Sequence, residues 1–402
     1  MYSLIFALAY KNAFARFSRS ALVIVMIAVS MSMMLSLQGL YDGMSENMID
    51  KNKRSYSGDL SIFAKGYLVD KELKNSFSDR MISQELKNTQ GVESYVSRLE
   101  VQGLLSTARK SAFISLLGID LQKEKMFGDF GEFLKEGELS TEKNSALVGL
   151  ELAKKLKVKL GSKVIFSSQD SSGEIISIAY RVKGIVQTTN IVYDTRAIFV
   201  DRSRIQKQLG LKPDQVSQIA MMVADKSVIK KLKSRYAKYD VKSFMELMPM
   251  MKQMQELMFW FNSITFLIVM GVVFIGIFGV MYVSVLERIR EFGIMLSVGY
   301  FYKAIRLQIV IEAIIIGLAG YIIGALIGFG VLSYLYHYGI ELSSFSDALE
   351  MWGYESTLYT TIKVHYFTNT FIAIIVASLL SVLIPLRKIK KLNPVDVIKV
   401  EK

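Results

Sequence analysis

The chain has 402 residues, of which 51% are hydrophobic and 21% charged, values close to those of soluble proteins. It has no cysteine, which excludes disulfides, thiolate metal sites and an acylated N-terminal cysteine. Its two histidines, His337 and His365, offer little basis for an imidazole metal site or a histidine-based catalytic triad. The net charge of +13 raises the question of nucleic-acid binding, which the location of the basic residues decides.

The first long apolar run covers residues 21–41 and carries no formal charge. About 20 apolar residues cross the hydrocarbon core of a bilayer, so this run predicts a transmembrane helix. Lys11, Arg16 and Arg19 precede it, as basic residues precede a secretory signal. The run is longer than the apolar core of a signal peptide and no A-x-A site closes it. We therefore expect a retained helix, with a cleaved signal as the alternative.

Three more apolar runs predict transmembrane helices, at 257–286, 307–336 and 367–386. As a helix, the run 257–286 would be about 45 Å long, so we expect it to project beyond the bilayer. Glycine recurs at every fourth residue in the run 307–336, at Gly320, Gly324 and Gly328. This spacing favours close helix–helix packing, although glycine is also generally common in membrane helices.

Lysine and arginine are concentrated before the first run, between the second and third, and after the fourth. Because cytoplasmic loops are enriched in basic residues, we expect three cytoplasmic segments, 1–20, 287–306 and 387–402. The segments 42–256 and 337–366 are then extracytoplasmic. This distribution accounts for much of the positive charge, and no basic–aromatic stripe indicates a nucleic-acid partner.

The segment 42–256 alternates short strand-like runs with helical patterns, which predicts an extracytoplasmic α+β domain with mixed strand pairing. Strands are expected at 92–106, 111–119, 145–150, 163–168, 174–186, 196–200 and 218–223. Helices are expected at 71–89, 150–156, 202–209 and 227–239, and a hairpin turn at 171–173. No P-loop, H-E-x-x-H or G-x-S-x-G motif occurs, so we expect no enzymatic activity, catalytic residue, metal or cofactor on this chain.

Four segments, in register, resemble the FtsX-like permease superfamily, which includes MacB-type exporters and LolC/LolE-type lipoprotein-releasing permeases. The loop VLERIREFGIMLSVGYFYKAI is similar to its ER-x-x-E-[IF]-G-I signature. The segments SALVGLELAKKLKVKLGSKVIF and YRVKGIVQTTNIVYDTRAIFVD are similar to its external-domain pattern. The tail resembles the superfamily through Pro385, Pro394 and Asp396, and the opening segment through Ala9, Lys11 and Asn12.

The resemblance implies a multi-pass permease of the bacterial inner membrane with a periplasmic domain. It would bind two copies of a cytoplasmic ABC ATPase, which carry ATP and Mg, and a second permease that is either the same chain or a paralogue. The resemblance also implies a coupling helix formed by Glu287, Arg288, Arg290, Glu291, Phe292 and Gly293, with Phe292 as a buried anchor in the ATPase. The alternative is that Arg288 and Arg290 only set the topology.

Members of this superfamily act by mechanotransmission, in which ATP-driven closure moves the external domain. Our first hypothesis is lipoprotein release, because the chain has no fused ATPase and carries a large external domain. A MacB-like exporter of peptides or amphiphiles and an FtsX-like signalling or hydrolase-activating scaffold are the alternatives. The three differ in the external partner, which would be a lipoprotein carrier, an adaptor or a hydrolase.

Two further hypotheses concern the membrane helices. Methionine adapts to irregular apolar ligands, so a substrate groove formed by Met31, Met34, Met258 and Phe261 is one interpretation, with ordinary packing as the commoner one. Glu312 is an intramembrane acid and hence a candidate for function, but its position favours pairing with Arg306 or the neighbouring loop.

Overall fold

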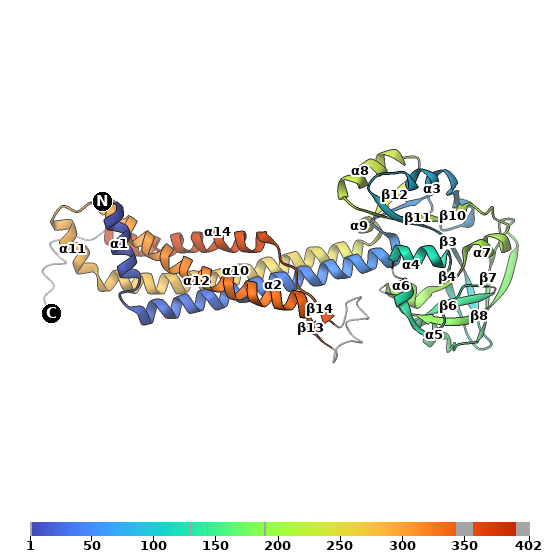
Figure 1. Ribbon diagram of the computed structural model, residues 1–402, viewed down its shortest axis with the longest axis horizontal. Helices are drawn as coiled ribbons and strands as arrows, with labels where there is room; N and C mark the ends of the chain where they lie inside the picture. Colours follow the sequence, from blue (N-terminus) through green and yellow to red (C-terminus); the bar gives the residue numbers. More distant parts are fainter. Residues whose placement is uncertain (1, 129, 143, 189, 343–356, 391–402) are drawn as a thin grey trace. The chain divides into compact units, whose positions relative to one another are not determined.

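The structure is a computed structural model that describes residues 2–390 apart from 129, 143, 189 and 343–356. Its residues fall into two compact units (Figure 1). Of the described residues, the helical unit contains 2–45, 254–342 and 357–390. The α/β unit contains the described residues of Glu46–Gln253. Much of the predicted loop 337–366, together with Pro394 and Asp396 of the tail, therefore lies outside the described residues.

In the described part of the chain, four helical segments are long and apolar enough to cross a membrane: Phe17–Ser55, Pro249–Glu287, Tyr302–Tyr338 and Val364–Lys390. Each contains one of the predicted runs, which confirms the prediction of four apolar helices. The α-helices concerned are α2 (Phe17–Asn52), α10 (Pro249–Glu287), α12 (Tyr302–Tyr338), α14 (Val364–Ser381) and α15 (Leu383–Lys390). Two shorter helices, α1 (Tyr2–Ala13) and α11 (Ile289–Ser297), complete this set.

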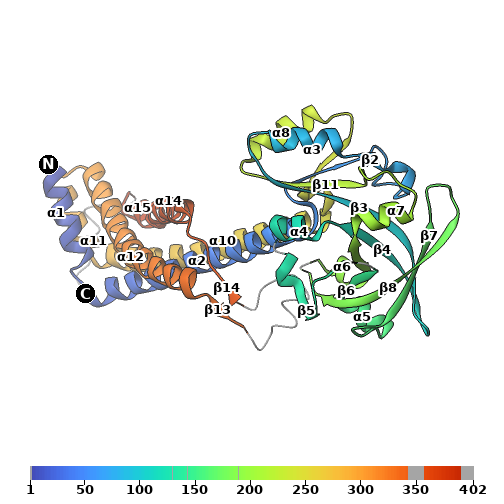
Figure 2. The same ribbon diagram turned by 45° about the vertical axis from the view of Figure 1, so that its right-hand side comes forward.

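Several of these helices extend beyond the apolar runs because a helix ends where its backbone hydrogen bonding ends, not where hydrophobicity ends. Pro249 begins α10, at the position where its missing N–H and fixed φ suit a helix. Gly339 ends α12 with φ +68° and donates its N–H to the Leu335 carbonyl. The helix α1 lies against α12 and buries Ile5 and Ala9 (Figure 2).

The glycines of α12 lie where its backbone approaches α2. A Cβ atom on Gly320 would lie 2.6 Å from Cβ of Ile27, and one on Gly324 would lie 2.7 Å from the Ala28 carbonyl oxygen. On Gly328, it would lie 2.9 Å from Cδ1 of Leu35. No larger residue fits at these positions without movement, as expected of a packing face of small residues.

The α/β unit is organised around a mixed sheet of ten strands. The path of neighbours is β12-β1-β11-β3-β4-β9-β6-β8-β5, and β7 pairs with β3 and β8. The pairs β4–β9 and β6–β8 are parallel and the others in this sheet are antiparallel, which confirms the predicted fold class. The strands are β1 (Leu60–Phe63), β3 (Val92–Ser106), β4 (Ser111–Ile119), β5 (Leu134–Gly137), β6 (Ser145–Gly149), β7 (Lys163–Gln169), β8 (Ile175–Val186), β9 (Ala197–Asp201), β11 (Gln218–Val223) and β12 (Asp240–Ser243).

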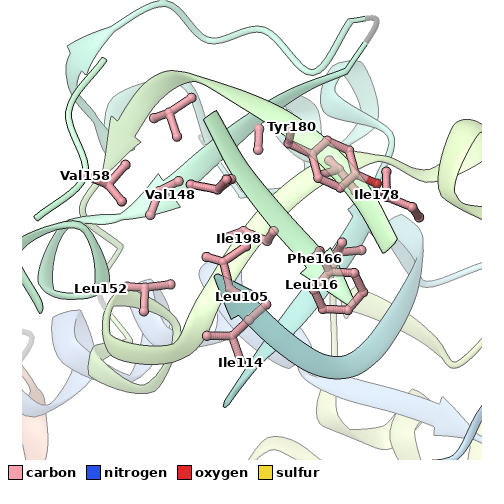
Figure 3. Close-up of a cluster of buried hydrophobic side chains, with 14 of the residues drawn as sticks. Leu105, Ile114, Leu116, Val148, Leu152, Val158, Phe166, Ile178, Tyr180 and Ile198 are labelled. Carbon is pink, nitrogen blue, oxygen red and sulfur yellow. The ribbon is translucent and has the colours of Figure 1, made fainter. Parts of the chain in front are cut away.

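Short helices connect these strands: α3 (Arg80–Lys87), α4 (Leu121–Gly128), α5 (Leu150–Leu156), α6 (Ile191–Arg196), α7 (Arg202–Gln208), α8 (Lys226–Arg235) and α9 (Phe244–Leu247). Two small strand pairs are separate from the main sheet, β2 (Phe77–Ser78) with β10 (Gln215–Val216) and β13 (Ile340–Glu341) with β14 (Thr357–Leu358). Inward-facing side chains of six strands form a core cluster that includes Leu105, Ile114, Val148, Phe166, Tyr180 and Ile198 (Figure 3). The alternating β-branched and aromatic residues therefore pack as a half-buried sheet requires.

The predicted helix over 71–89 is wrong in its extent. The chain forms a 3₁₀ turn at Leu73–Asn75, then strand β2, and only then the helix α3. Pairing of β2 with β10 takes up backbone groups that a longer helix would need, and the Asp79 N–H donates to the Asp214 carbonyl at 2.8 Å. The buried face of α3 consists of Ile82 and Leu86, whereas Met81 is 73% exposed.

Candidate functional site

The segment that resembles a coupling helix forms the separate short helix α11. Only Arg288 stands between the end of α10 and the start of α11. After α11, Gly299 adopts φ +91° and donates its N–H to the Leu296 carbonyl, which turns the chain towards α12. The helix is thus held between two sharp breaks and is a distinct element at one end of the helical unit (Figure 1).

Glu287 connects the end of α10 to the turn between α1 and α2. Its carboxylate accepts a hydrogen bond from Arg19 at 2.8 Å and also pairs with Arg16. Both arginines are about half exposed, so solvent screens each pair and its contribution to stability is small. These contacts fix the position of Glu287 more than they stabilise the fold.

Arg288 and Glu312 form a buried ion pair between the α10–α11 joint and α12. The Arg288 Nη1 atom lies 3.1 Å from Oε2 of Glu312, and Ser284 donates its hydroxyl to Oε1 of Glu312 at 3.1 Å. The Glu312 side chain is only 3% exposed. Of the two partners expected for Glu312, the structure pairs it with the neighbouring loop. We call the contacts of Glu287, Arg288 and Glu312 the α11 brace.

Phe292 requires a correction to the expected coupling site. It is 0% exposed and packs in the chain's own core, and the Arg288 guanidinium lies 5.0 Å from the centre of its ring. Gly293 is buried beside it. A side chain that its own helices enclose is not available to fill a groove on a partner. Phe292 instead fastens α11 to the helical unit.

An apolar surface where α11 ends and α12 begins remains exposed and was not among the expected coupling residues; we call it the exposed face of α11. Ile294, Val298 and Phe301 are 49%, 82% and 75% exposed. Arg290 and Glu291, which were predicted, are also exposed. Ile294 and Val298 are four residues apart on α11 and its C-cap, whereas Phe301 follows the turn at Gly299 and caps the start of α12. No single helical period therefore marks all three residues in the sequence. Of the six predicted coupling residues, Glu287, Arg290 and Glu291 are therefore exposed, whereas Arg288, Phe292 and Gly293 are partly or fully buried in the joint.

The predicted groove residues do not come together. Met31 and Met34 are 0% exposed, and Cβ of Met31 lies against Gly324 of α12. Met258 is partly exposed and Phe261 is 54% exposed on α10. The first two methionines therefore serve helix packing, the commoner of the two interpretations, and the structure does not form a groove from these four residues.

In the α/β unit, the tyrosine–aspartate turn of the family pattern lies on α6. Asp194 is 4% exposed, and its Oδ1 accepts hydrogen bonds from the Thr188 N–H at 2.7 Å and the Thr188 hydroxyl at 2.9 Å. Burial raises the pKa of Asp194 to about 7. A Cβ atom on Gly149 would lie 2.5 Å from the Asp194 carbonyl oxygen, so this close approach requires glycine. The turn is an internal support with no exposed reactive group.

Comparison with known proteins places the two units in described families. Residues 20–239 match the model of the MacB-like periplasmic core domain, and residues 263–394 match the FtsX-like permease C-terminal model. A macrolide export ATP-binding/permease protein MacB of Haemophilus ducreyi is 28% identical over 266 residues, which are 60% of this chain and 35% of that protein. Its counterpart in Aggregatibacter actinomycetemcomitans is 27% identical over 345 residues, 77% of this chain and 50% of that protein.

The chain thus spans between 35% and 50% of the length of these two relatives. The solved periplasmic region of MacB from Actinobacillus actinomycetemcomitans aligns with a TM-score of 0.35 at 19% identity, over 52% of this chain and 97% of that structure. The match to the MacB-like periplasmic core domain covers more than half of the chain and includes most of the first apolar helix. The match to the FtsX-like permease domain follows it and covers most of the other three apolar helices. The chain therefore belongs to the ABC transporter permeases in which a MacB-like periplasmic core domain is joined to an FtsX-like permease domain.

Proposed function

We propose that this permease is driven by a separate ABC ATPase that binds the exposed face of α11, and that it works by mechanotransmission. The observation that carries the proposal is the α11 brace. Through Glu287 the brace contacts the turn before α2, and through Glu312 it contacts α12. Since Phe292 adds a buried apolar contact, a force on α11 is passed to the helical unit as a whole.

The exposed face of α11 has the composition of a protein interface. Ile294, Val298 and Phe301 supply an apolar centre, and Arg290 and Glu291 supply a charged rim. Interfaces typically combine such a centre with a polar border that excludes water and fixes orientation. ATP and Mg would be held by the ATPase, and the two ATPase copies would act on this chain and a second permease of the same or a paralogous sequence.

The movement has a route to the external domain through the chain itself, because α2 precedes the α/β unit and α10 follows it. We propose lipoprotein release from the bacterial inner membrane as the function, with both termini cytoplasmic and the α/β unit periplasmic. Mechanotransmission suits this task, since an acylated protein in the outer leaflet need not cross the bilayer. A soluble lipoprotein carrier would be the external partner.

MacB-like export is the second candidate, and the names of the curated relatives favour it. In that case a periplasmic adaptor would be the external partner and a peptide or small amphiphile the substrate. The relatives are ATP-binding/permease proteins by name, and this chain matches only part of each.

A photoreactive amino acid at Val298 tests the docking face, with the same residue at Leu160 of the α/β unit as the control. Both side chains are exposed and apolar. In living cells we expect an ATPase crosslinked to position 298 and not to position 160. Crosslinks to the ATPase from neither position would contradict docking at α11.

The substrate is tested in proteoliposomes that contain the permease and the ATPase that crosslinking identifies. ATP-dependent transfer of a triacylated lipoprotein into the aqueous phase supports lipoprotein release. Transfer of a small amphiphile, with the lipoprotein left in the membrane, supports the exporter and contradicts lipoprotein release.

A further inference from the structure

A cavity of about 620 Å³ lies in the helical unit between α2, α10 and α14. Part of its lining is apolar and includes Phe266, Ile372 and Val376. Another part is polar and includes Gln38 and Asn262. Neither the α11 brace nor the predicted methionine groove contributes a residue to it. The cavity therefore needs its own explanation.

Two side-chain amide oxygens of the polar lining are buried without a hydrogen-bond partner among the described residues. They are Oε1 of Gln38, a residue only 8% exposed, and Oδ1 of Asn262. Buried polar atoms are nearly always paired, because an unsatisfied one retains its full desolvation cost. Both oxygens are acceptors, so the missing group is a hydrogen-bond donor.

The charges around the cavity argue against an anionic head group. Asp42 accepts hydrogen bonds from the Lys363 ammonium and the Tyr366 hydroxyl, each at 2.6 Å. Among the described residues, no lysine or arginine lines the cavity. His365 and Asn369 also line the cavity, but beside the two amide oxygens and Asp42 a phosphate or carboxylate would meet further acceptors, whereas an N–H or O–H group would complete the pairing.

A second cavity of about 480 Å³ continues the first one along α10 and α14. The two share Ser263, Phe266, Ala373 and Val376. The second is lined almost entirely by apolar side chains and reaches Phe274 and Leu380. From Asn262 to Phe274 the helix rises about 18 Å, slightly more than half of the roughly 30 Å hydrocarbon core. This length suits one acyl chain that extends from an interfacial head group.

We propose that the two cavities form one binding site, the α10–α14 trough, for a single-chain amphiphile whose head group donates N–H or O–H hydrogen bonds to Gln38 and Asn262. The acyl chain lies along Phe266 and Ala373. Binding at this site needs no ATPase, so the proposal goes beyond the transport function and can be tested without it.

The test uses the full chain in phosphatidylcholine nanodiscs, whose head group has no donor. The probe is a 14-carbon N-acyl ethanolamide with a diazirine midway along its chain, and the comparison probe is the methyl ester of the same acid. We expect the amide to label peptides of α10 and α14 that line the trough. The ester should label them three- to tenfold less, the effect of about one hydrogen bond.

Two variants and two controls locate the site. Ala373→Phe adds bulk where the two cavities meet and should reduce labelling by the amide at least tenfold. Leu379→Phe adds bulk on the exposed side of the same helix and should leave labelling unchanged. Asn262→Leu should reduce the preference for the amide over the ester, because only Gln38 then accepts, whereas Ile264→Ala, at a 57% exposed position of α10, should keep it.

Unchanged thermal unfolding midpoints in nanodiscs identify variants that fold. Asn262 is less buried than Gln38, so its replacement by leucine is the variant of the two acceptors that tests the site with the smaller risk to folding. Equal labelling by amide and ester, or labelling that Ala373→Phe leaves unchanged, would overturn the proposal. If no ATPase crosslinks at Val298 but the amide still labels the trough, the binding site is supported and the proposed transport function is contradicted.

Discussion

The buried pair of Arg288 and Glu312 allows a quantitative test of how α11 is held. Removing one member of a buried ion pair costs about 3–5 kcal/mol, because the other charge remains uncompensated. Glu312 is nearly fully enclosed, so Arg288→Met should show this cost. Methionine retains an apolar contact with Phe292, which separates the loss of charge from a loss of packing. The double variant Arg288→Met/Glu312→Leu removes both charges and should be close to neutral.

Hydrogen–deuterium exchange of the α11 backbone amides in nanodiscs measures this local stability directly. A cost of about 3 kcal/mol corresponds to exchange that is faster by about 100-fold, since each tenfold step is 1.36 kcal/mol. We expect that acceleration for Arg288→Met and near wild-type exchange for the double variant. Arg290→Met, at an exposed position of α11, is the control and should have little effect. If Arg288→Met accelerates exchange less than threefold, or if the double variant is as fast as the single one, the brace does not hold α11.

Two further predictions concern buried positions elsewhere. The raised pKa of Asp194, about 7, means that the folded state binds more protons than the unfolded state between about pH 4 and 7, so stability falls as pH rises through this window, by about 4 kcal/mol in total. Asp194→Asn keeps an acceptor for both Thr188 hydrogen bonds. Chemical denaturation at pH 4.5 and pH 8 should show the fall in the free energy of unfolding in the wild type only. Equal falls in wild type and variant would contradict the raised pKa of Asp194. Gly324→Ala would place Cβ 2.7 Å from the Ala28 carbonyl oxygen and should cost about 1–3 kcal/mol, measured as a lower unfolding midpoint. Gly330→Ala has open space around its Cβ and should leave the midpoint unchanged. Equal midpoints for the two variants would show that α12 does not need glycine for its contact with α2.

Seven of the ten strands of the main sheet were predictable from local sequence pattern, whereas the four-residue strands β1, β5 and β12 were not predicted. The expected runs 92–106 and 111–119 coincide with β3 and β4, and the hairpin turn at 171–173 joins β7 and β8. Gly173 adopts φ +88° there, and Asp170 accepts hydrogen bonds from the Ser172 and Glu174 backbone. Such turns depend on neighbouring residues only, which a sequence displays directly.

Features that depend on distant contacts were not predictable in the same way. The helix expected over 71–89 is interrupted because β2 pairs with β10, which lies more than a hundred residues later in the chain. Phe292 suited an exposed anchor by composition, but only its packing in a cluster with residues of the other helices shows that it faces inward. The orphan amide oxygens of Gln38 and Asn262 are likewise a property of the assembled helices.

The proposed function as a whole is tested most directly by affinity purification of the chain from its native membrane in mild detergent, followed by mass spectrometry. We expect an ABC ATPase, a second permease and triacylated lipoproteins to co-purify with the wild type. Val298→Asp should lose the ATPase, because a carboxylate would be buried at the centre of the docking face, while Leu160→Asp in the α/β unit should retain it. A stable wild-type preparation that contains no ATPase would contradict the account.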